Sequence, residues 1–188
     1  MLIDALQFLT STLFDLIATA FFLRFWLQWA RVPFRNPLAQ FVVKVTDFAV
    51  KPLRRVIPGL LGVDWASVLP LLVTECLAMW ISLLLAGEGV GTLFAPGILV
   101  LALTATLRLG LYVLMGCVIV QAVISWVNPY SPFAPVFQAL TRPVLAPLQR
   151  FIPPVGGMDL SPMVALILIQ LLLVAPVAAL ERLARGLL

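Results

Sequence analysis

The chain has 188 residues, of which 63% are apolar and only 11% charged, and its mean hydropathy is +1.13. Soluble domains are about 45–50% apolar and about 25% charged, so this composition excludes an ordinary soluble protein and indicates an integral membrane protein. Its length fits four membrane-spanning helices of about 20 residues each, and the net charge of +4 comes without any histidine, the usual proton carrier at neutral pH.

The first two spans are predicted from about Phe8 to Trp29 and from about Ala66 to Ala86. The N-terminal stretch carries Asp4 and Asp15 and no basic residue, unlike a cleaved signal peptide, so we interpret it as the start of the first span. Arg24 lies about one turn from the end of this span. Its long side chain is expected to reach the membrane surface.

The apolar stretch 94–127 is too long for one upright helix, because it would reach about 50 Å across a hydrocarbon core of about 30 Å. Arg108 interrupts this stretch, and we therefore predict the third span from about Leu109 to Trp126. Residues 94–107 are then an interfacial or re-entrant segment, or an extension beyond the membrane.

The fourth span is predicted from about Ser161 to Leu180. Ser161 is expected to provide a hydroxyl N-cap, and Pro162 then occupies the first helical position.

One segment of the chain occurs twice. Residues 46–64 read TDFAVKPLRRVIPGLLGVD and residues 141–159 read TRPVLAPLQRFIPPVGGMD, at a constant offset of 95 residues. The identical pairs include Thr46 with Thr141, Pro52 with Pro147, Arg55 with Arg150, and Asp64 with Asp159. Each copy lies between two apolar runs, which predicts an all-α membrane protein of two tandem parallel repeats, 1–90 and 91–188.

The connecting segment of each repeat is predicted to be an amphipathic helix at the membrane surface. In residues 40–55 the polar positions recur every three or four residues, at Gln40, Lys44, Asp47, Lys51, Arg54 and Arg55. Pro52 is expected to break or restart this helix. The second copy, with prolines at 132, 135, 143 and 147, is expected to be a surface helix with breaks. Basic residues near anionic lipid contribute about 1 kcal/mol each, so anionic lipid is an expected partner.

Basic residues are unevenly distributed between the two sides of the predicted bundle. The first connection carries Arg31, Arg35, Lys44, Lys51, Arg54 and Arg55, and the third carries Arg142 and Arg150. The other side has only Arg182 and Arg185 beyond the spans. The positive-inside rule therefore predicts cytoplasmic connections and external termini. Four tryptophans near the same span ends fit an interfacial aromatic belt: Trp26, Trp29, Trp65 and Trp126.

Two interpretations remain open for the charged residues of the repeated motif. In the first, Arg55 and Arg150 bind lipid phosphate or helix-end carbonyls, and Asp64 and Asp159 cap the following spans. In the second, arginine and aspartate pair near the bundle axis and form a polar site for an ion or a partner.

Two charged residues lie within the predicted membrane region. Glu75 falls midway along the second span, where a carboxylate usually faces the bundle interior or a cavity and marks a functional site; the alternative is a protonated packing residue. Arg108 marks an outer boundary or pairs with Glu75 or Glu88.

The motifs of enzyme active sites are missing from the sequence. It contains no phosphate-binding glycine loop, GxSxG, HExxH or CxxC motif. Cys76 and Cys117 lie inside apolar runs and are expected to be buried apolar residues. We therefore expect no enzyme activity, metal or cofactor, and the basic stripe favours lipid or protein over nucleic acid as its partner.

Three segments, LRFWLQWARVPFRNPLAQFVVKVT, KPLRRVIPGLLGVD and APLQRFIPPVGGMDLSP, resemble the bacterial YggT family, called YlmG in other lineages. The resemblance covers nearly the whole chain, although Gln149 stands where a second arginine pair would be complete. It implies a bacterial inner-membrane protein of a family associated with osmotic or cation homeostasis, with cell division and envelope organisation, and in plastids with assembly of membrane complexes.

The sequence thus supports two functional hypotheses. The first is a non-enzymatic scaffold or assembly factor that contacts anionic lipid and a partner membrane protein, or a second copy of itself, through Arg54, Arg55 and Arg150. The alternative is an oligomeric channel or transporter component for small cations that uses Glu75, Asp64 and Asp159.

Overall fold

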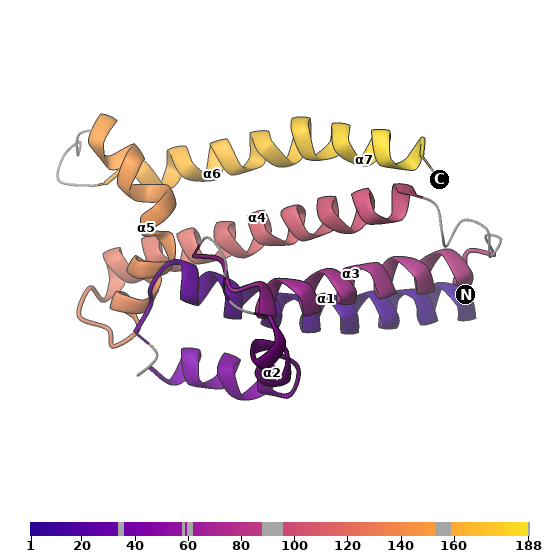
Figure 1. Cartoon of the computed structure of the whole chain (residues 1–188). Helices are drawn as coiled ribbons and strands as arrows, with labels where there is room; N and C mark the ends of the chain where they lie inside the picture. Colours follow the sequence, from indigo (N-terminus) through magenta and orange to yellow (C-terminus); the bar gives the residue numbers. More distant parts are fainter. Residues whose placement is uncertain (34–35, 58, 60–61, 88–95, 153–158, 188) are drawn as a thin grey trace.

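The structure, a computed structural model, describes all residues except 34–35, 58, 60–61, 88–95, 153–158 and 188. Four helical rods run alongside one another, with both termini at the same end of the bundle (Figure 1). They are α1 (Leu2–Trp29), α3 (Trp65–Leu85), α4 (Pro96–Val127) and the continuous series α6 (Ser161–Leu172), η2 (Leu173–Val177) and α7 (Ala178–Arg185). All four are long and apolar enough to cross a membrane, which confirms the predicted all-α fold with four spans.

Two shorter helices, α2 (Pro37–Val56) and α5 (Ala134–Phe151), lie toward the end of the bundle opposite the termini (Figure 1). Each half of the chain therefore follows the predicted order of span, short helix and span. The two short helices also end alike: Ile57 follows α2 with φ −113° and ψ 106°, and Ile152 follows α5 with φ −111° and ψ 103°. The tandem repeat is thus present in the backbone as well as in the sequence.

The predicted helix breaks at proline are wrong. The helix α2 continues through Pro52, and α5 continues through Pro143 and Pro147. A proline removes a single backbone donor, and the helical bonding resumes directly after it. The N–H of Ile57 bonds the carbonyl of Leu53 at 2.8 Å, and that of Ile152 bonds Leu148 at 2.9 Å.

The interruption predicted at Arg108 is also wrong. The helix α4 is one rod of 32 residues through Arg108, so residues 96–107 are no separate re-entrant segment; residues 94–95 lie outside the described chain. Arg108 forms an ion pair with Glu181 of α7, and this pairing compensates its charge without a break in the helix. A rod of this length reaches about 48 Å, which fits the alternative of an extension beyond the membrane.

The fourth span begins and ends differently from the prediction. It continues past Leu180 to Arg185, and Pro176 lies in a π-helical turn, a wider turn that accommodates a disturbed hydrogen-bond ladder. Ser161 is the first helical residue rather than the N-cap, which is Leu160. The side chain that satisfies the free N–H of Ser161 is Asp159, whose Oδ1 accepts it at 2.9 Å.

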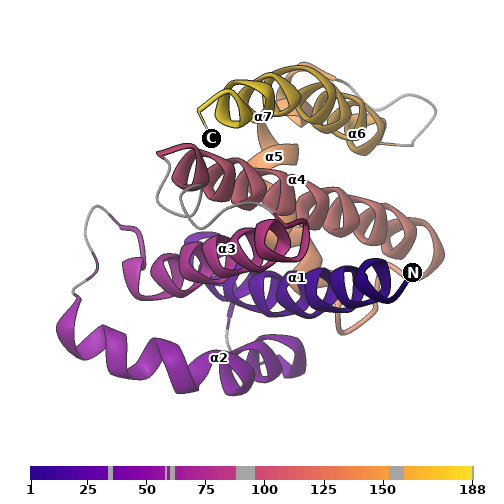
Figure 2. The same ribbon diagram turned by 90° about the vertical axis from the view of Figure 1, so that its right-hand side faces the viewer.

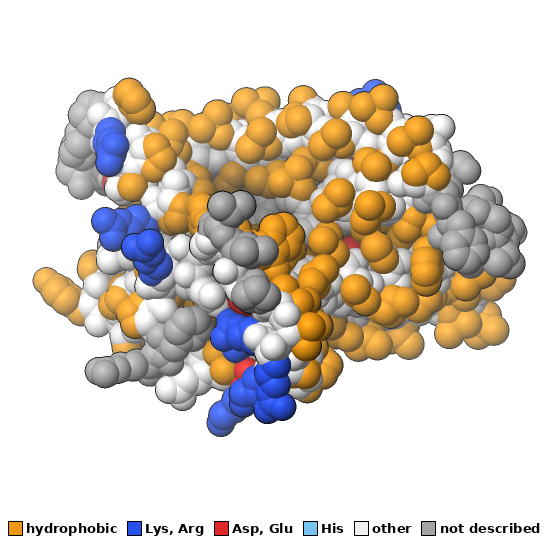
Figure 3. All heavy atoms as spheres, in the orientation of Figure 1, with side chains coloured by type: hydrophobic (Ala, Val, Ile, Leu, Met, Phe, Trp, Pro, Cys, Tyr) orange, Lys and Arg blue, Asp and Glu red, His pale blue; other side chains and the backbone are white. Residues whose placement is uncertain are grey.

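The two repeats pack side by side through α3 and α4, with α1 against α3 and α6–α7 against α4 (Figure 2). At the end of the bundle that carries α2 and α5, one apolar cluster joins α1, α2, α4 and α5; it includes Leu27, Val42, Cys117, Val136 and Leu140. Cys117 is therefore a buried apolar residue, as expected. Basic side chains gather at this same end, while apolar side chains cover most of the rods (Figure 3).

Candidate functional site

The turn of the first repeat, between α2 and α3, is built around a buried aspartate. Asp64 is only 5% exposed. Two nitrogens of Arg54 bind its carboxylate: Nη2 lies 2.5 Å from Oδ2, and Nε lies 3.3 Å from Oδ1. The Ser67 hydroxyl donates to Asp64 Oδ2 at 2.6 Å. Arg54 Nη2 also donates to Gln28 Oε1 of α1 at 2.6 Å. One arginine thus ties together α1, α2 and the start of α3.

Burial by itself raises the pKa of Asp64. The hydrogen bonds from Arg54 and Ser67, together with the charge of Arg54, outweigh this effect and hold its pKa below the ordinary value. Asp64 is therefore a carboxylate at neutral pH. The turn passes through Gly62, whose φ of +77° lies in the left-handed region that favours glycine; the matching Gly157 lies outside the described residues.

The aspartate of the second repeat is held from the matching position of α5, and no ion pair involves it among the described residues. Gln149 Nε2 donates to Asp159 Oδ2 at 2.8 Å, and Gln149 occupies the position that matches Arg54. Burial raises the pKa of Asp159, but the hydrogen bonds from Ser161 and Gln149 outweigh it and lower the pKa. Each motif aspartate is therefore held by position 54 or 149, and among the hydrogen bonds of the described residues none joins it to Arg55 or Arg150.

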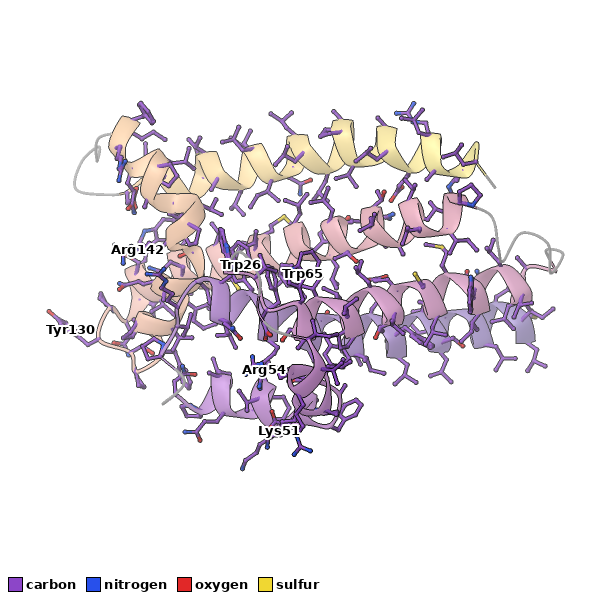
Figure 4. All side chains as sticks on the ribbon, viewed as in Figure 1. Trp26, Lys51, Arg54, Trp65, Tyr130 and Arg142 are labelled. Atoms are coloured by element: carbon purple, nitrogen blue, oxygen red, sulfur yellow. The ribbon has the colours of Figure 1, made fainter. Side chains whose placement is uncertain are left out.

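Arg55 and Arg150 are both exposed on the last turns of α2 and α5. Arg150 lines a groove of about 380 Å³ between the end of α1 and α5, together with Arg31, Arg142 and Pro147. Arg31 has a φ of +53°, which is unusual for a residue with a side chain. Figure 4 shows Arg142 on α5 at the end of the bundle that carries the short helices. This groove brings three arginines to one surface.

A second charge network joins α1 to α2. Arg24 is only 5% exposed, and its Nη2 lies 3.1 Å from Asp47 Oδ1, so its side chain is buried against α2. Asp47 Oδ2 also binds Lys51 Nζ at 2.8 Å. The hydrogen bond from Lys51 and the charge of Arg24, opposed by burial, lower the pKa of Asp47. The polar spacing along α2 could be predicted, but no local signal indicated this contact with α1.

Trp26 connects the two repeats. Its Nε1 donates to the backbone carbonyl of Leu140 in α5 at 2.9 Å, and its ring stacks on Phe22 with centroids 5.9 Å apart. The predicted membrane anchor is therefore also a structural contact between α1 and α5. Trp126, which is 67% exposed, retains the properties of an interfacial side chain.

Four charged residues, Asp15, Glu75, Arg108 and Glu181, come together from the four rods. Glu75 is buried and lies close enough to Arg108 and Asp15 for their charges to act on it. Arg108 itself forms an ion pair with Glu181, whereas the alternative partner Glu88 lies outside the described residues. The sequence singled out Glu75 and Arg108 but missed Asp15 and Glu181. Within the described chain, no three His, Cys, Asp or Glu side chains gather as a metal site would require.

Comparison with known proteins places both halves of the chain in one family. The family model described as CCB3/YggT matches residues 3–85 and 100–180. A protein of Vibrio alginolyticus from the proC 3′ region is 40% identical over 168 residues, which cover 89% of this chain and 90% of that protein. The YggT protein of Escherichia coli K12 is 37% identical over 170 residues, which cover 90% of this chain and 87% of that protein. No solved structure matches the chain.

Proposed function

Because the chain belongs to the CCB3/YggT family of multi-pass membrane proteins, we propose that it is a non-enzymatic scaffold or assembly factor of the bacterial inner membrane. In this role α2 and α5 lie on the cytoplasmic face. There they contact anionic lipid and a partner membrane protein through Arg55 and Arg150, while Arg54 positions the turn between α2 and α3.

The observation that carries this proposal is that neighbouring residues of each repeated motif have different contacts. The aspartates are satisfied inside the turns by Arg54 and Gln149. The next residues, Arg55 and Arg150, remain exposed at matching positions. Two equivalent, exposed arginines at one end of the bundle suit phosphate or carboxylate groups outside the chain, because a guanidinium binds both with paired hydrogen bonds.

The three faces of α2 support a position at the membrane surface. One face packs against the bundle through Ala39, Val42, Thr46 and Val50. A second face exposes apolar side chains, namely Leu38, Phe41, Val45 and Phe48. The third carries the polar stripe from Gln40 to Arg55. A helix with an apolar face beside a basic face lies in the plane of the interface, and basic residues favour the cytoplasmic side.

The experiment combines charge reversal with recovery of lipid and protein partners. The double variant Arg55→Glu, Arg150→Glu is expressed in cells, crosslinked in native membranes and purified, and the bound phospholipids and crosslinked proteins are quantified. We expect several-fold losses of both, since two attractive contacts become repulsive. The control reverses Arg182 and Arg185, at the opposite end of the bundle. Unchanged recovery in the first variant, at equal membrane levels, contradicts the proposal.

The charge cluster of Asp15, Glu75 and Arg108 favours a second candidate, an oligomeric channel or transporter component for small cations. Charged side chains within spans commonly mark ion pathways. The test is cation flux into proteoliposomes over a range of gradients, for the wild type and Glu75→Gln. Flux that Glu75→Gln abolishes supports this candidate, and the absence of flux in the wild type rejects it.

A further inference from the structure

A polar cavity of about 620 Å³ lies between α1 and α2. Its lining includes three cationic side chains, Arg24, Lys44 and Arg54, together with Gln28 and Gln40. The first arginine comes from the span and the other two cations from the short helix, so the cavity exists only because α2 packs against α1. It is separate from the groove that Arg150 lines.

Arg24 is the feature of this cavity that its protein contacts leave unexplained. The side chain is 5% exposed, and among the described residues only its Nη2 has a hydrogen-bond partner, Asp47. Its Nε and Nη1 are buried and have no hydrogen-bond acceptor among the described residues. A guanidinium carries five N–H donors, and buried donors without acceptors are strongly unfavourable. The buried face of Arg24 therefore lacks an acceptor group.

The charge balance around the cavity shows what kind of acceptor fits. The two neighbouring carboxylates are already engaged: Asp47 binds Arg24 and Lys51, and Asp64 binds Arg54. Arg24 and Arg54 are close enough to repel each other electrostatically. The three cations of the lining, Arg24, Lys44 and Arg54, thus have only two carboxylates beside them, and Asp47 is also shared with Lys51. An added anion with several oxygens would relieve both the repulsion and the missing hydrogen bonds.

The position of the cavity indicates where this anion comes from. The exposed apolar row Leu38, Phe41, Val45 and Phe48 lies on the adjacent face of α2, so the cavity opens at the depth where apolar and polar surfaces meet. Phospholipid headgroups lie at this depth beside an interfacial helix. Figure 4 shows Arg54 and Lys51 on α2, and Trp65, the first residue of α3, is of a type that favours the same region.

The geometry points to a phosphate-binding cavity for an anionic phospholipid. In this cavity the buried side chain of Arg24 binds the phosphate, and Lys44 and Arg54 flank the phosphate. This inference deepens the proposed contact with anionic lipid and rests on that proposal for the depth of α2 at the membrane surface. It assigns lipid recognition to Arg24 and Lys44, which the repeated motif does not contain.

The test measures phosphatidylglycerol bound to the full chain in detergent micelles, by native mass spectrometry over a lipid titration. We expect Lys44→Ala to weaken binding about fivefold, as the loss of one cation near an anionic headgroup implies, and Arg24→Gln to weaken it at least about tenfold, because a charged bidentate contact is lost. The matched control is Lys51→Ala, on the same stripe of α2 but outside the cavity lining. It should bind as the wild type does.

Three outcomes overturn the inference. The first is lipid binding by Lys44→Ala as tight as that of the wild type, which rejects the cavity even if Arg24→Gln fails to fold. The second is an equal loss of binding in Lys44→Ala and Lys51→Ala. Inorganic phosphate that stabilises the lipid-free protein against heat as well as phosphatidylglycerol does would reject the lipid as the source of the phosphate. An Arg55→Ala variant separates this inference from the proposed function: if it weakens lipid binding while Lys44→Ala does not, the cavity is rejected and the exposed contact stands.

Discussion

Arg54 and Gln149 occupy equivalent positions in the two repeats, and each holds an aspartate ten residues further along the chain. The Arg54 contact is a bidentate ion pair with Asp64, whereas Gln149 gives Asp159 a single neutral donor at 2.8 Å. Both turns nevertheless lead from the end of a short helix into the next span. A neutral donor therefore suffices to hold the aspartate of the second repeat. In the proposed phosphate-binding cavity, the charge of Arg54 also flanks the anion.

Substitutions of Arg54 should separate the effect of its hydrogen-bond donors on stability from the effect of its positive charge. In Arg54→Gln the new amide can donate to Asp64 as Gln149 does to Asp159, so we expect only a small loss of stability. In Arg54→Ala the buried carboxylate keeps only Ser67, and an under-satisfied buried charged group costs about 1–3 kcal/mol. The lower end is expected, because the arginine side chain is 43% exposed. Unfolding in detergent measures both variants, and equal losses would contradict a donor-based turn.

Stability should depend on pH at the acidic end. The pKa values of Asp64 and Asp159 are lowered in the folded chain from an ordinary value of 3.8, so each carboxylate stabilises the fold above that value. The contribution is lost as the pH falls through the lowered folded-state pKa. We expect the melting temperature to be level near neutral pH and to fall below about pH 4.

The double variant Asp64→Asn, Asp159→Asn provides the control for this pH dependence. It should be less stable than the wild type at pH 7 and should lose less stability between pH 5 and pH 3, as the stabilising carboxylates are gone. Identical acid profiles for the two proteins would assign the dependence to other groups, with Asp47 as the next candidate.

The repeated motif allowed the sequence to predict the order of elements, because apolar runs and a duplicated basic segment are local signals. It could not decide between Arg54 and Arg55 as the partner of Asp64. That choice depends on where α2 ends: with Val56 as its last residue, position 54 faces the turn and position 55 faces outward.

The errors have a common physical origin in contacts between residues that are distant in the chain. Arg108 resembled a span boundary because its partner, Glu181, lies on another rod. The burial of Arg24 against Asp47 could not be predicted, because Asp47 belongs to the following helix. In both cases the local sequence showed that a charged residue is present. Its partner depends on tertiary packing, which the local sequence does not show.

The contact between α1 and α4 should tolerate little added volume at Gly110. A Cβ atom built there would lie 2.7 and 2.9 Å from two ring carbons of Phe22, closer than side chains pack. Phe22 is itself buried, so its ring must shift, and overpacking of this kind costs about 1–3 kcal/mol. We expect Gly110→Ala to lower the melting temperature in detergent.

The matched control for Gly110 lies on the same helix. Gly116 has no heavy atom within 4 Å of a built Cβ, and alanine favours helix over glycine by about 1 kcal/mol. Gly116→Ala should therefore be neutral or stabilising. A Gly110→Ala variant as stable as Gly116→Ala would show that the two rods do not approach this closely.

The hydrogen bond from Trp26 to Leu140 should stabilise the junction between the repeats. Trp26→Phe keeps a ring against Phe22 but removes the Nε1 donor, leaving a buried carbonyl with one partner fewer. We expect a loss of about 0.5–1.5 kcal/mol, the net value of a typical hydrogen bond. Trp126→Phe is the control, since that side chain is 67% exposed and should change stability little.

Because the bond joins α1 to α5, the Trp26 variant should also speed amide hydrogen exchange in α5 more than in α2. Equal acceleration in both short helices, or equal stability of the two tryptophan variants, would rule out a specific link between the repeats.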